Sequence, residues 1–305
     1  MTHSVFIDGE AGTTGLQIRD RLLGRYDIRL VQLDPAMRKD PQARADCFAQ
    51  ADVAILCLPD AAAREAVTLT ADMDVRLIDA STAHRIDPDW VFGFPELAPE
   101  MRERIAAARL VSNPGCYSTG AIAIVAPLVA AGLIDETEAL SINAISGYTG
   151  GGKAMVADFE AGTAPVHFIY GLDQRHKHIP EIMTHGGLLL QPVFAPSVGN
   201  FAQGMAVQLQ LQLDDDRSVA ALHQALADHY ANEAFVQVVP ADQIGARIDP
   251  TALNGSNVLR ISVHGDDETG CATIVAVLDN LGKGASGAAV QNMNIMLGLP
   301  EGTSL

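Results

Sequence analysis

The sequence has little positive charge, few aromatic side chains and no long uninterrupted apolar run. Its 305 residues include 20 Lys and Arg against 37 Asp and Glu, which gives a formal net charge of −17 at pH 7. Nucleic acids and anionic membrane surfaces select clustered basic side chains, so this charge balance argues against both as partners. The best candidate for a membrane span, residues 121–133, is too short and is interrupted by Pro127.

Cysteine is also scarce, and its spacing argues against two classes of site. The four cysteines, Cys47, Cys57, Cys116 and Cys271, form no C-x-x-C pair, the spacing typical of zinc sites and redox dithiols. We therefore expect reduced thiols, no metal and a cytoplasmic location. The start of the chain agrees with that location, because neither a basic segment nor a small-residue cleavage site precedes the first apolar strand.

What the sequence does contain is an alternation of short apolar runs and helix-like segments. Four strand-like runs, at residues 4–8, 28–33, 51–59 and 75–79, are separated by turns and helical patterns. This order is typical of a doubly wound parallel sheet in an α/β protein. We therefore predict a Rossmann-type dinucleotide-binding domain over residues 1–115, with a C-terminal helix over 286–305 that packs back on it.

The second half of the chain has a different pattern. Residues 204–213 alternate apolar side chains and glutamines with period two, as a half-buried strand does. Further strand-like runs at 235–239, 258–264 and 272–278 complete a mostly antiparallel sheet, and a helix over 217–230 covers it. We predict an α+β catalytic and oligomerisation domain over residues 116–285.

A glycine-rich turn follows the first predicted strand. Gly9, Gly12 and Gly15 form a G-x-x-G-x-x-G pattern, with Thr13 and Thr14 at the start of the following helix. Glycines in this place let the backbone approach a pyrophosphate, while the helix supplies N–H groups and its dipole. The turn therefore predicts a dinucleotide site, although a glycine-rich connection without a ligand would have the same sequence.

The type of dinucleotide is left open by the residues themselves. Asp34 ends the second predicted strand, where an acidic side chain can bind both ribose hydroxyls of NAD. Arg38 and Lys39 follow closely and could instead bind the 2′-phosphate of NADP. A solvated pair of loop charges is the other interpretation of these two cations.

Cys116 lies in the segment SNPGCYSTG, between a strand-like run and a long apolar helix. The Pro114-Gly115 turn places the cysteine in the first helical turn, where unpaired N–H groups and the helix dipole favour a thiolate. We interpret Cys116 as a nucleophile. A buried, inert cysteine behind a turn is the alternative.

Three further segments carry candidate functional side chains. Arg85, on a predicted ligand-facing loop, is a candidate anion clamp, and a surface salt bridge is its alternative role. His176 and His178 are candidates for proton transfer to or from a nucleophilic cysteine, and spacing alone does not separate them. Asn292, in the final predicted helix, is placed near a cofactor amide.

The glycine turn, NPGCYSTG, HKHIPEI and the terminal GKGASGAAVQNMN together resemble the shorter form of the N-acetyl-gamma-glutamyl-phosphate reductases. The resemblance runs nearly from end to end of the chain. It implies NADPH-dependent reduction of N-acetylglutamyl 5-phosphate to N-acetylglutamate 5-semialdehyde, in arginine biosynthesis, by a homodimer or homotetramer. A cysteine thioester is the expected intermediate.

The same resemblance assigns roles to individual residues. Cys116 matches the nucleophile, His178 the acid/base residue, and Arg85, Asn113 and Glu181 the substrate-binding positions. The implied cofactor-binding residues are Gly9, Gly12, Thr13, Thr14, Gly15, Arg38, Lys39, Ser81 and Asn292. The chain departs from the family's pattern at His84, where other members often have an aromatic residue.

Two alternative enzymes and one alternative of another kind compete with this interpretation. An aspartate-semialdehyde dehydrogenase-like enzyme would reduce another acyl phosphate on the same general plan. A cysteine hydrolase or acyltransferase would use Cys116 and a histidine, with a purely structural glycine turn. A catalytically silent nucleotide-binding regulator would keep the cofactor site alone.

Overall fold

The computed structural model describes residues 2–215 and 217–305. The chain forms two compact units. Unit 1 contains Met1–Pro114 and Ala285–Leu305, and unit 2 contains Gly115–Gly284. No helix in the described part of the chain is long and apolar enough to cross a membrane.

Unit 1 is built on sheet A, a parallel sheet of six strands in the order β2-β1-β3-β4-β6-β5. Apolar residues on both faces of its strands are buried, as expected when helices cover a parallel sheet on both sides. The chain moves to opposite sides of β1 to form β2 and β3, so the sheet has a switch point between β1 and β3. The strands are β1 (His3–Asp8), β2 (Ile28–Val31), β3 (Val53–Leu56), β4 (Arg76–Asp79), β5 (Val91–Phe92) and β6 (Leu110–Ser112).

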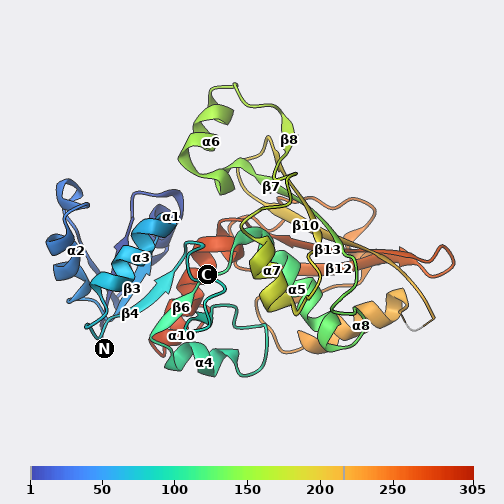
Figure 1. The fold of residues 1–305 in the computed structure, drawn as a ribbon, viewed down its shortest axis with the longest axis horizontal. Helices are drawn as coiled ribbons and strands as arrows, with labels where there is room; N and C mark the ends of the chain where they lie inside the picture. Colours follow the sequence, from blue (N-terminus) through green and yellow to red (C-terminus); the bar gives the residue numbers. More distant parts are fainter. Residues whose placement is uncertain (1, 216) are drawn as a thin grey trace. The chain divides into compact units, whose positions relative to one another are not determined.

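The helices of unit 1 follow the strands in the order the sequence predicts, and Figure 1 shows α1 and α3 beside the blue strands. Helix α10 returns from the C-terminal part of the chain and buries Val290 and Met293 in the same core as β1. The helices are α1 (Thr13–Leu22), α2 (Pro41–Phe48), α3 (Asp60–Leu69), α4 (Met101–Ala107) and α10 (Gly287–Met296), with a short 3-10 turn η1 (Pro35–Met37).

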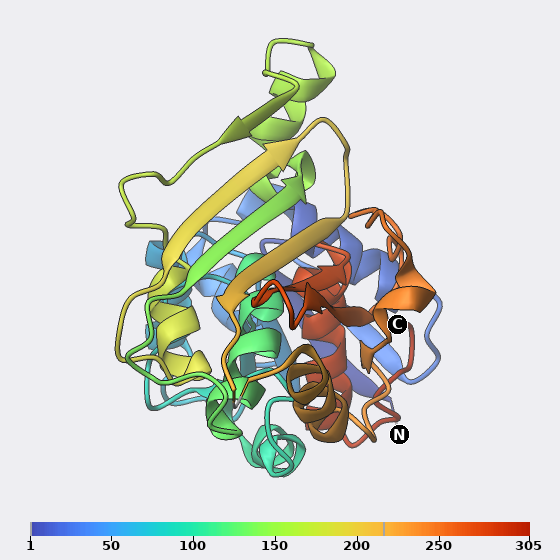
Figure 2. The same ribbon diagram turned by 90° about the vertical axis from the view of Figure 1, so that its right-hand side faces the viewer.

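Unit 2 is built on sheet B, a mixed sheet of seven strands in the order β11-β12-β13-β10-β7-β9-β8. Strand pairs β11·β12 and β7·β9 are parallel, and the other neighbours are antiparallel. Figure 2 shows β9, β7 and β10 side by side. The strands are β7 (Ser141–Gly147), β8 (His167–Ile169), β9 (Val193–Gly199), β10 (Met205–Gln212), β11 (Val236–Val238), β12 (Leu259–Asp266) and β13 (Cys271–Leu278).

Helix α5 lies at the centre of unit 2 and contacts α7, α8, β10 and β13. It is apolar on all sides, because sheet strands and helices surround it. The helices of this unit are α5 (Cys116–Ala130), α6 (Gly152–Glu160), α7 (Ile179–Gly186), α8 (Val219–His229) and α9 (Ala241–Ile244), with a 3-10 turn η2 (Tyr148–Gly151) and a π turn η3 (Gly282–Ser286).

The parallel Rossmann-type sheet and the α/β class are as predicted, but some element boundaries are not. The predicted final helix over 286–305 ends at Met296, because the chain turns at Leu297 and Gly298 takes a left-handed φ of 66°. Helix α3 begins at Asp60, whose carboxylate accepts hydrogen bonds from the Thr82 N–H and hydroxyl.

Candidate active site

The glycine turn after β1 is closed so tightly that only glycine fits two of its positions. A Cβ atom on Gly9 would lie 2.3 Å from the carbonyl oxygen of Cys57, and Gly9 has a left-handed φ of 88°. A Cβ atom on Gly15 would lie 2.7 Å from the Gly9 oxygen. Gly12 donates to that oxygen over 2.9 Å and is the N-cap of α1, so Thr13 and Thr14 occupy the first helical turn. The backbone therefore offers helix N–H groups to an anion without obstruction by side chains.

A cavity of about 660 Å³ opens beside this turn. Its lining includes Gly9, the residues that follow β2 and β3, and the cations Arg38 and Lys39. It lies at the carboxyl ends of the strands and at the switch point of the sheet, where open α/β sheets bind their ligands. The cradle of the glycine turn and the size of the cavity thus fit a dinucleotide.

The loop after β2 places its acidic and its basic side chains differently. Asp34 is the N-cap of η1, and its carboxylate accepts a hydrogen bond of 2.9 Å from the Ala36 N–H. Its side chain is exposed and is not among those that line the cavity, whereas Arg38 and Lys39 line it. The positive side chains therefore face the cofactor cavity, and the acidic one is engaged in the turn.

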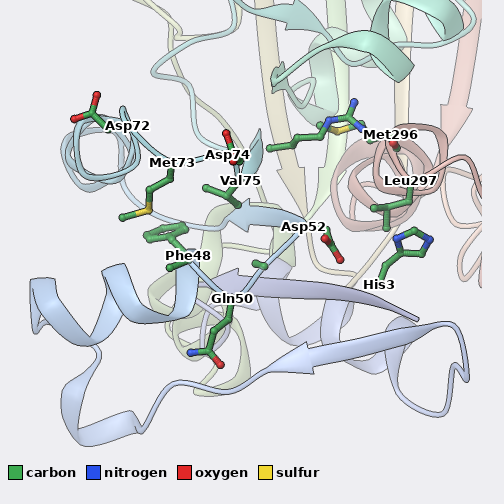
Figure 3. Close-up of a pocket in the computed structure, with 13 residues that line it drawn as sticks. His3, Phe48, Gln50, Asp52, Asp72, Met73, Asp74, Val75, Met296 and Leu297 are labelled. Carbon is green, nitrogen blue, oxygen red and sulfur yellow. Dashed lines mark hydrogen bonds between the residues drawn. The ribbon is translucent and has the colours of Figure 1, made fainter. Parts of the chain in front are cut away.

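A second cleft, of about 720 Å³, lies at the amino ends of the strands of sheet A (Figure 3). His3, Asp52 and Arg76 line it, at or just before the first residues of β1, β3 and β4. Figure 3 also labels Asp72, Asp74 and Leu297 among the residues that line it. Since the amino ends of parallel strands are not where such sheets bind nucleotides, we do not assign the cofactor to this cleft.

In unit 2, Cys116 is the first residue of α5 and Gly115 is its N-cap. The Gly115 carbonyl accepts hydrogen bonds from the Thr119 N–H and from the Ser118 and Thr119 hydroxyls. The side chains that follow the cysteine thus hold the first turn together. Cys116 is partly exposed and lies at the positive end of the helix dipole, as the sequence predicts.

Glu181 ties helix α7 to this helix start. Its carboxylate, 1% exposed, accepts a hydrogen bond of 2.8 Å from the Gly115 N–H. Glu181 lies in the first turn of α7, whose N-cap is His178. The N-terminal turns of α5 and α7, with Cys116 on one and His178 on the other, are therefore joined by a buried charge-assisted hydrogen bond.

Tyr117 lies between the two helix starts. Its ring centroid is 5.9 Å from that of His178, and its hydroxyl donates to the Ser197 carbonyl over 2.8 Å. Burial raises the pKa of Tyr117 well above its usual range. Burial also raises the pKa of Tyr170 to about 12; a hydrogen bond with Tyr117 opposes the rise, and a negative charge on Cys116 adds to it. Both phenols therefore keep their protons at neutral pH and remain hydrogen-bond donors.

Arg85 and Asn113 lie in unit 1, at the carboxyl ends of β4 and β6. Arg85 donates to the carbonyls of Asn113 and Ala80 over 3.0 and 3.1 Å and is 9% exposed. The Asn113 side chain donates to the Ala285 carbonyl over 3.0 Å and is 1% exposed. The guanidinium is thus buried and fixed at the strand ends by two backbone carbonyls.

Asp79, which ends β4, organises the loop that carries Arg85. Its carboxylate accepts from the Ser81 N–H and hydroxyl and lies 2.7 Å from His84 Nδ1. The His84 ring stacks on Trp90, with ring centroids 4.3 Å apart and planes 11° apart. The predicted cofactor residue Ser81 therefore uses its side chain within the loop, and the loop is rigidly built.

Asn292 of α10 is fully buried in unit 1. Its side-chain amide donates to the Gly93 carbonyl over 2.9 Å and to Asn113 Oδ1 over 3.2 Å. Its own Oδ1 is buried and has no hydrogen-bond partner among the described residues. A buried acceptor of this kind is expected to meet a donor, and the carboxamide of a nicotinamide has one.

Two cysteines of unit 1, Cys57 and Cys47, have poorly reactive surroundings. Burial raises the pKa of Cys57 to about 12, and the charges of Asp79 and Asp8 add to the rise. Burial raises the pKa of Cys47 as well. No cluster of His, Cys, Asp and Glu that could hold a metal ion occurs among residues 2–215 and 217–305.

Family models match both halves of the chain. Residues 11–106 match the NAD-binding domain of semialdehyde dehydrogenase, and residues 116–280 match the semialdehyde dehydrogenase dimerisation domain. The N-acetyl-gamma-glutamyl-phosphate reductase of Brucella anthropi is 52% identical over 98% of this chain and 99% of its own length. That of Sinorhizobium medicae is 51% identical over 97% and 99%.

The chain belongs to the N-acetyl-gamma-glutamyl-phosphate reductase family. The family resemblance predicted from the sequence is therefore confirmed. The chain is an oxidoreductase with a nicotinamide-nucleotide-binding domain.

Solved structures of related enzymes share the fold. Aspartate semialdehyde dehydrogenase II of Vibrio cholerae, complexed with ASA, has a TM-score of 0.71 over 97% of this chain and 98% of its own, at 15% identity. The Candida albicans enzyme, solved with NADP, has a TM-score of 0.70 over 97% and 99%, at 12% identity. At such low identity these structures show the fold alone. The aspartate-semialdehyde dehydrogenase alternative is not favoured, because the relatives that are 51–52% identical over nearly the whole chain are N-acetyl-gamma-glutamyl-phosphate reductases.

The sequence does not indicate Asp79, which organises the Arg85 loop in unit 1, or Tyr117 and Tyr170, which lie near Cys116 and His178 in unit 2. Asp79 ends a predicted strand of the parallel sheet, a position that could have marked it. The two tyrosines carry no local signal, because they meet only when α5 and the segment after β8 fold together.

Proposed function

We propose that the chain reduces N-acetyl-L-glutamyl 5-phosphate to N-acetyl-L-glutamate 5-semialdehyde and phosphate, with NADPH and through a thioester on Cys116, in arginine biosynthesis. One observation carries the chemistry. Cys116 is the first residue of α5. The Gly115 N–H before it donates to the carboxylate of Glu181 on α7, the helix whose N-cap is His178. The family of the chain supports the choice of substrate.

The covalent step begins at the sulfur. The Cys116 thiolate attacks the acyl carbonyl, a C–S bond forms, and the C–O bond to phosphate breaks with release of phosphate. The nicotinamide supplies the hydride that reduces the thioester carbonyl when the cofactor is bound. The thiohemiacetal then returns its hydroxyl proton to His178, the C–S bond breaks, and Cys116 leaves as the thiolate while the aldehyde forms.

The remaining side chains move a proton and neutralise charge. His178 accepts the thiol proton before attack and donates a proton to the oxyanion that hydride transfer creates. Arg85 balances the charge of the departing phosphate, and Asn113 holds Arg85 through its carbonyl. Glu181 keeps the Gly115 N–H, and with it the start of α5, in place.

The preference for NADPH over NADH rests on the loop after β2. Arg38 and Lys39 line the cofactor cavity and suit a 2′-phosphate, because phosphate favours positive partners. Asp34 accepts a hydrogen bond from the Ala36 N–H within the turn and is not among the residues that line the cavity. Gly9, Gly12, Thr13, Thr14 and Gly15 would hold the pyrophosphate.

We also propose a cytoplasmic homodimer or homotetramer. Apolar side chains are exposed along one edge of sheet B, among them Val166, Ile169 and Val193. They lie on or beside β8 and β9, and β8 is an edge strand. An exposed apolar edge favours association. The matched family model, described as a dimerisation domain, supports it.

The test is reduction of NADP⁺ that depends on both phosphate and N-acetylglutamate 5-semialdehyde. Cys116→Ala should abolish this activity and Cys271→Ala, at an exposed cysteine of the same unit, should retain it. Full activity of Cys116→Ala would exclude the thioester. A higher kcat/KM with aspartate semialdehyde than with N-acetylglutamate semialdehyde would exclude the proposed substrate.

A further inference from the structure

His176 is enclosed by aromatic rings from separate parts of unit 2. Its ring centroid lies 6.0 Å from that of Tyr117 on α5 and 5.1 Å from that of Phe194 on β9. The Tyr170 ring lies 5.5 Å away and the His178 ring 4.7 Å away. All of these contacts are edge-to-face, the arrangement that the charge distribution of aromatic rings favours. The His176 ring is therefore fixed in orientation as well as in position.

One nitrogen of this ring holds the backbone of the next histidine. The His178 N–H donates to His176 Nδ1 over 3.2 Å. Nδ1 accepts, so it carries no proton, and the proton of the neutral ring is on Nε2. The His178 carbonyl is held as well, because it accepts from the Ile182 N–H over 2.9 Å. Both backbone groups of His178 are thus fixed, one by a side chain and one by helix α7.

We propose that His176 is a positioning residue whose neutral ring holds the His178 backbone and thereby fixes the origin of the His178 side chain. The inference rests on the proposed function, in which His178 moves the proton. It separates two histidines that the sequence leaves equivalent: His178 reacts, and His176 acts through it.

The surroundings of His176 favour a ring that is neutral near pH 7. The pKa of His176 is lowered from its ordinary 6.5 to about 4, mainly by burial and also by the charge of Lys177, while Asp173 opposes the change. The Tyr170 phenol, whose pKa burial raises to about 12, is uncharged at neutral pH. Protonation of His176 at Nδ1 would also break the hydrogen bond from the His178 N–H. A group in this state is poorly suited to proton transfer near pH 7.

The test compares two substitutions that separate the acceptor from the ring. His176→Asn keeps an acceptor oxygen near the position of Nδ1 and loses the ring. His176→Phe keeps a ring and loses the acceptor. We expect the Phe variant to lower kcat about 10- to 100-fold with KM changed less than about twofold, and the Asn variant to recover most of the loss.

Phe194→Leu is the matched control, because it removes a ring neighbour of His176 without removing the acceptor. It should lower the melting temperature and leave kcat within about twofold of the unchanged chain. Equal losses of kcat in the Asn and Phe variants would overturn the proposal, since the ring alone would then matter. Loss of a limb of the pH profile of kcat/KM in the Asn variant would also overturn it, because it would make His176 the titrating group.

A second measurement needs no turnover. Amide hydrogen exchange of the His178 N–H, followed by NMR, should be slow in the unchanged chain and in His176→Asn, and at least about tenfold faster in His176→Phe. An unchanged exchange rate of the His178 N–H in His176→Phe would show that His176 does not hold the His178 backbone, whatever the activity of the variant. If the unchanged chain does not turn over the acyl phosphate, the proposed function fails, and the exchange result alone decides whether His176 holds His178.

Discussion

Gly284 lies against the residue proposed as the nucleophile, and this close approach predicts a large effect from a single methyl group. A Cβ atom on Gly284 would lie 2.9 Å from the Cys116 Cβ and 3.3 Å from its Cα. Gly284 is part of the π turn η3, where its N–H donates to the Asp279 carbonyl over 3.0 Å. Its φ is not left-handed, so Gly284→Ala tests space and not backbone strain.

The size of the effect follows from the overlap. Non-bonded carbon atoms approach to about 3.5–4.0 Å, so the added methyl group must displace Cys116 or η3 by about 0.6–1 Å. A displacement of about 1 Å at a reacting group costs up to about 100-fold in rate. We therefore expect Gly284→Ala to lower kcat about 10- to 100-fold, which is about 1.4–2.7 kcal/mol in the barrier. Overpacking should also lower the free energy of unfolding by about 1–3 kcal/mol.

Gly120→Ala supplies the control. It lies on the same helix α5, and its added Cβ would meet Val207 Cγ2 at 2.7 Å and not Cys116. The assay measures kcat with saturating substrates, the rate of Cys116 alkylation by iodoacetamide, and urea unfolding. Both variants should lose stability, and only Gly284→Ala should lose kcat and alkylation rate. A Gly284→Ala enzyme with kcat within twofold of Gly120→Ala would refute the reasoning.

Three further predictions follow from the site. Because the pKa of His176 is lowered to about 4 in the folded chain, its neutral ring stabilises the fold at pH values above the unfolded pKa of 6.5. This stabilisation is lost as the pH falls from 6.5 to about 4. The difference in unfolding free energy between the unchanged chain and His176→Asn should therefore shrink over that range; a constant difference would contradict it. Replacing both Arg38 and Lys39 by Ala should raise KM for NADPH about 10- to 100-fold and leave KM for NADH within about twofold in steady-state assays; equal effects on both cofactors would exclude a 2′-phosphate site. Glu181→Ala should lower the free energy of unfolding by about 1.5–3 kcal/mol and lower kcat, because it leaves the buried Gly115 N–H without its acceptor; Glu181→Gln, which keeps an oxygen acceptor, should lose less of both.

Local sequence signals predict the cofactor turn and the start of α5 well. Gly15 is required by contacts with Gly9 and Glu10 in the same turn, and Gly9 by its own left-handed φ of 88°, so the glycine spacing carries this information. The close approach of Gly9 to the Cys57 carbonyl is a long-range contact that the spacing does not show. Cys116 is placed by a Pro-Gly turn before a long apolar run, which is also a local signal. The parallel order of the first sheet follows from alternating strands and helices.

Features that depend on distant contacts escape the same reasoning. His176 and His178 are told apart by contacts that form only in the fold: His178 is the N-cap of α7, and His176 lies against rings from α5 and β9 and accepts from the His178 N–H. Asp34 follows β2, where an acidic side chain can bind a ribose, but its carboxylate accepts a hydrogen bond from the Ala36 N–H within the turn. Helix α7 has a Pro in its first turn and a left-handed Gly187 at its end, which are both helix signals. The helix is not predicted from the sequence, because the ionisable residues before it follow no amphipathic period.

The stacking of His84 on Trp90 gives the protein an intrinsic optical reporter. Trp90 is the only tryptophan in the sequence, so all tryptophan emission comes from one place. The ring is 7% exposed and lies face to face with the imidazole next to Arg85. A ligand that binds Arg85 or displaces the His84 ring changes the surroundings of this single fluorophore. Anion binding at the loop can therefore be followed by fluorescence in the unlabelled chain, in real time and without turnover.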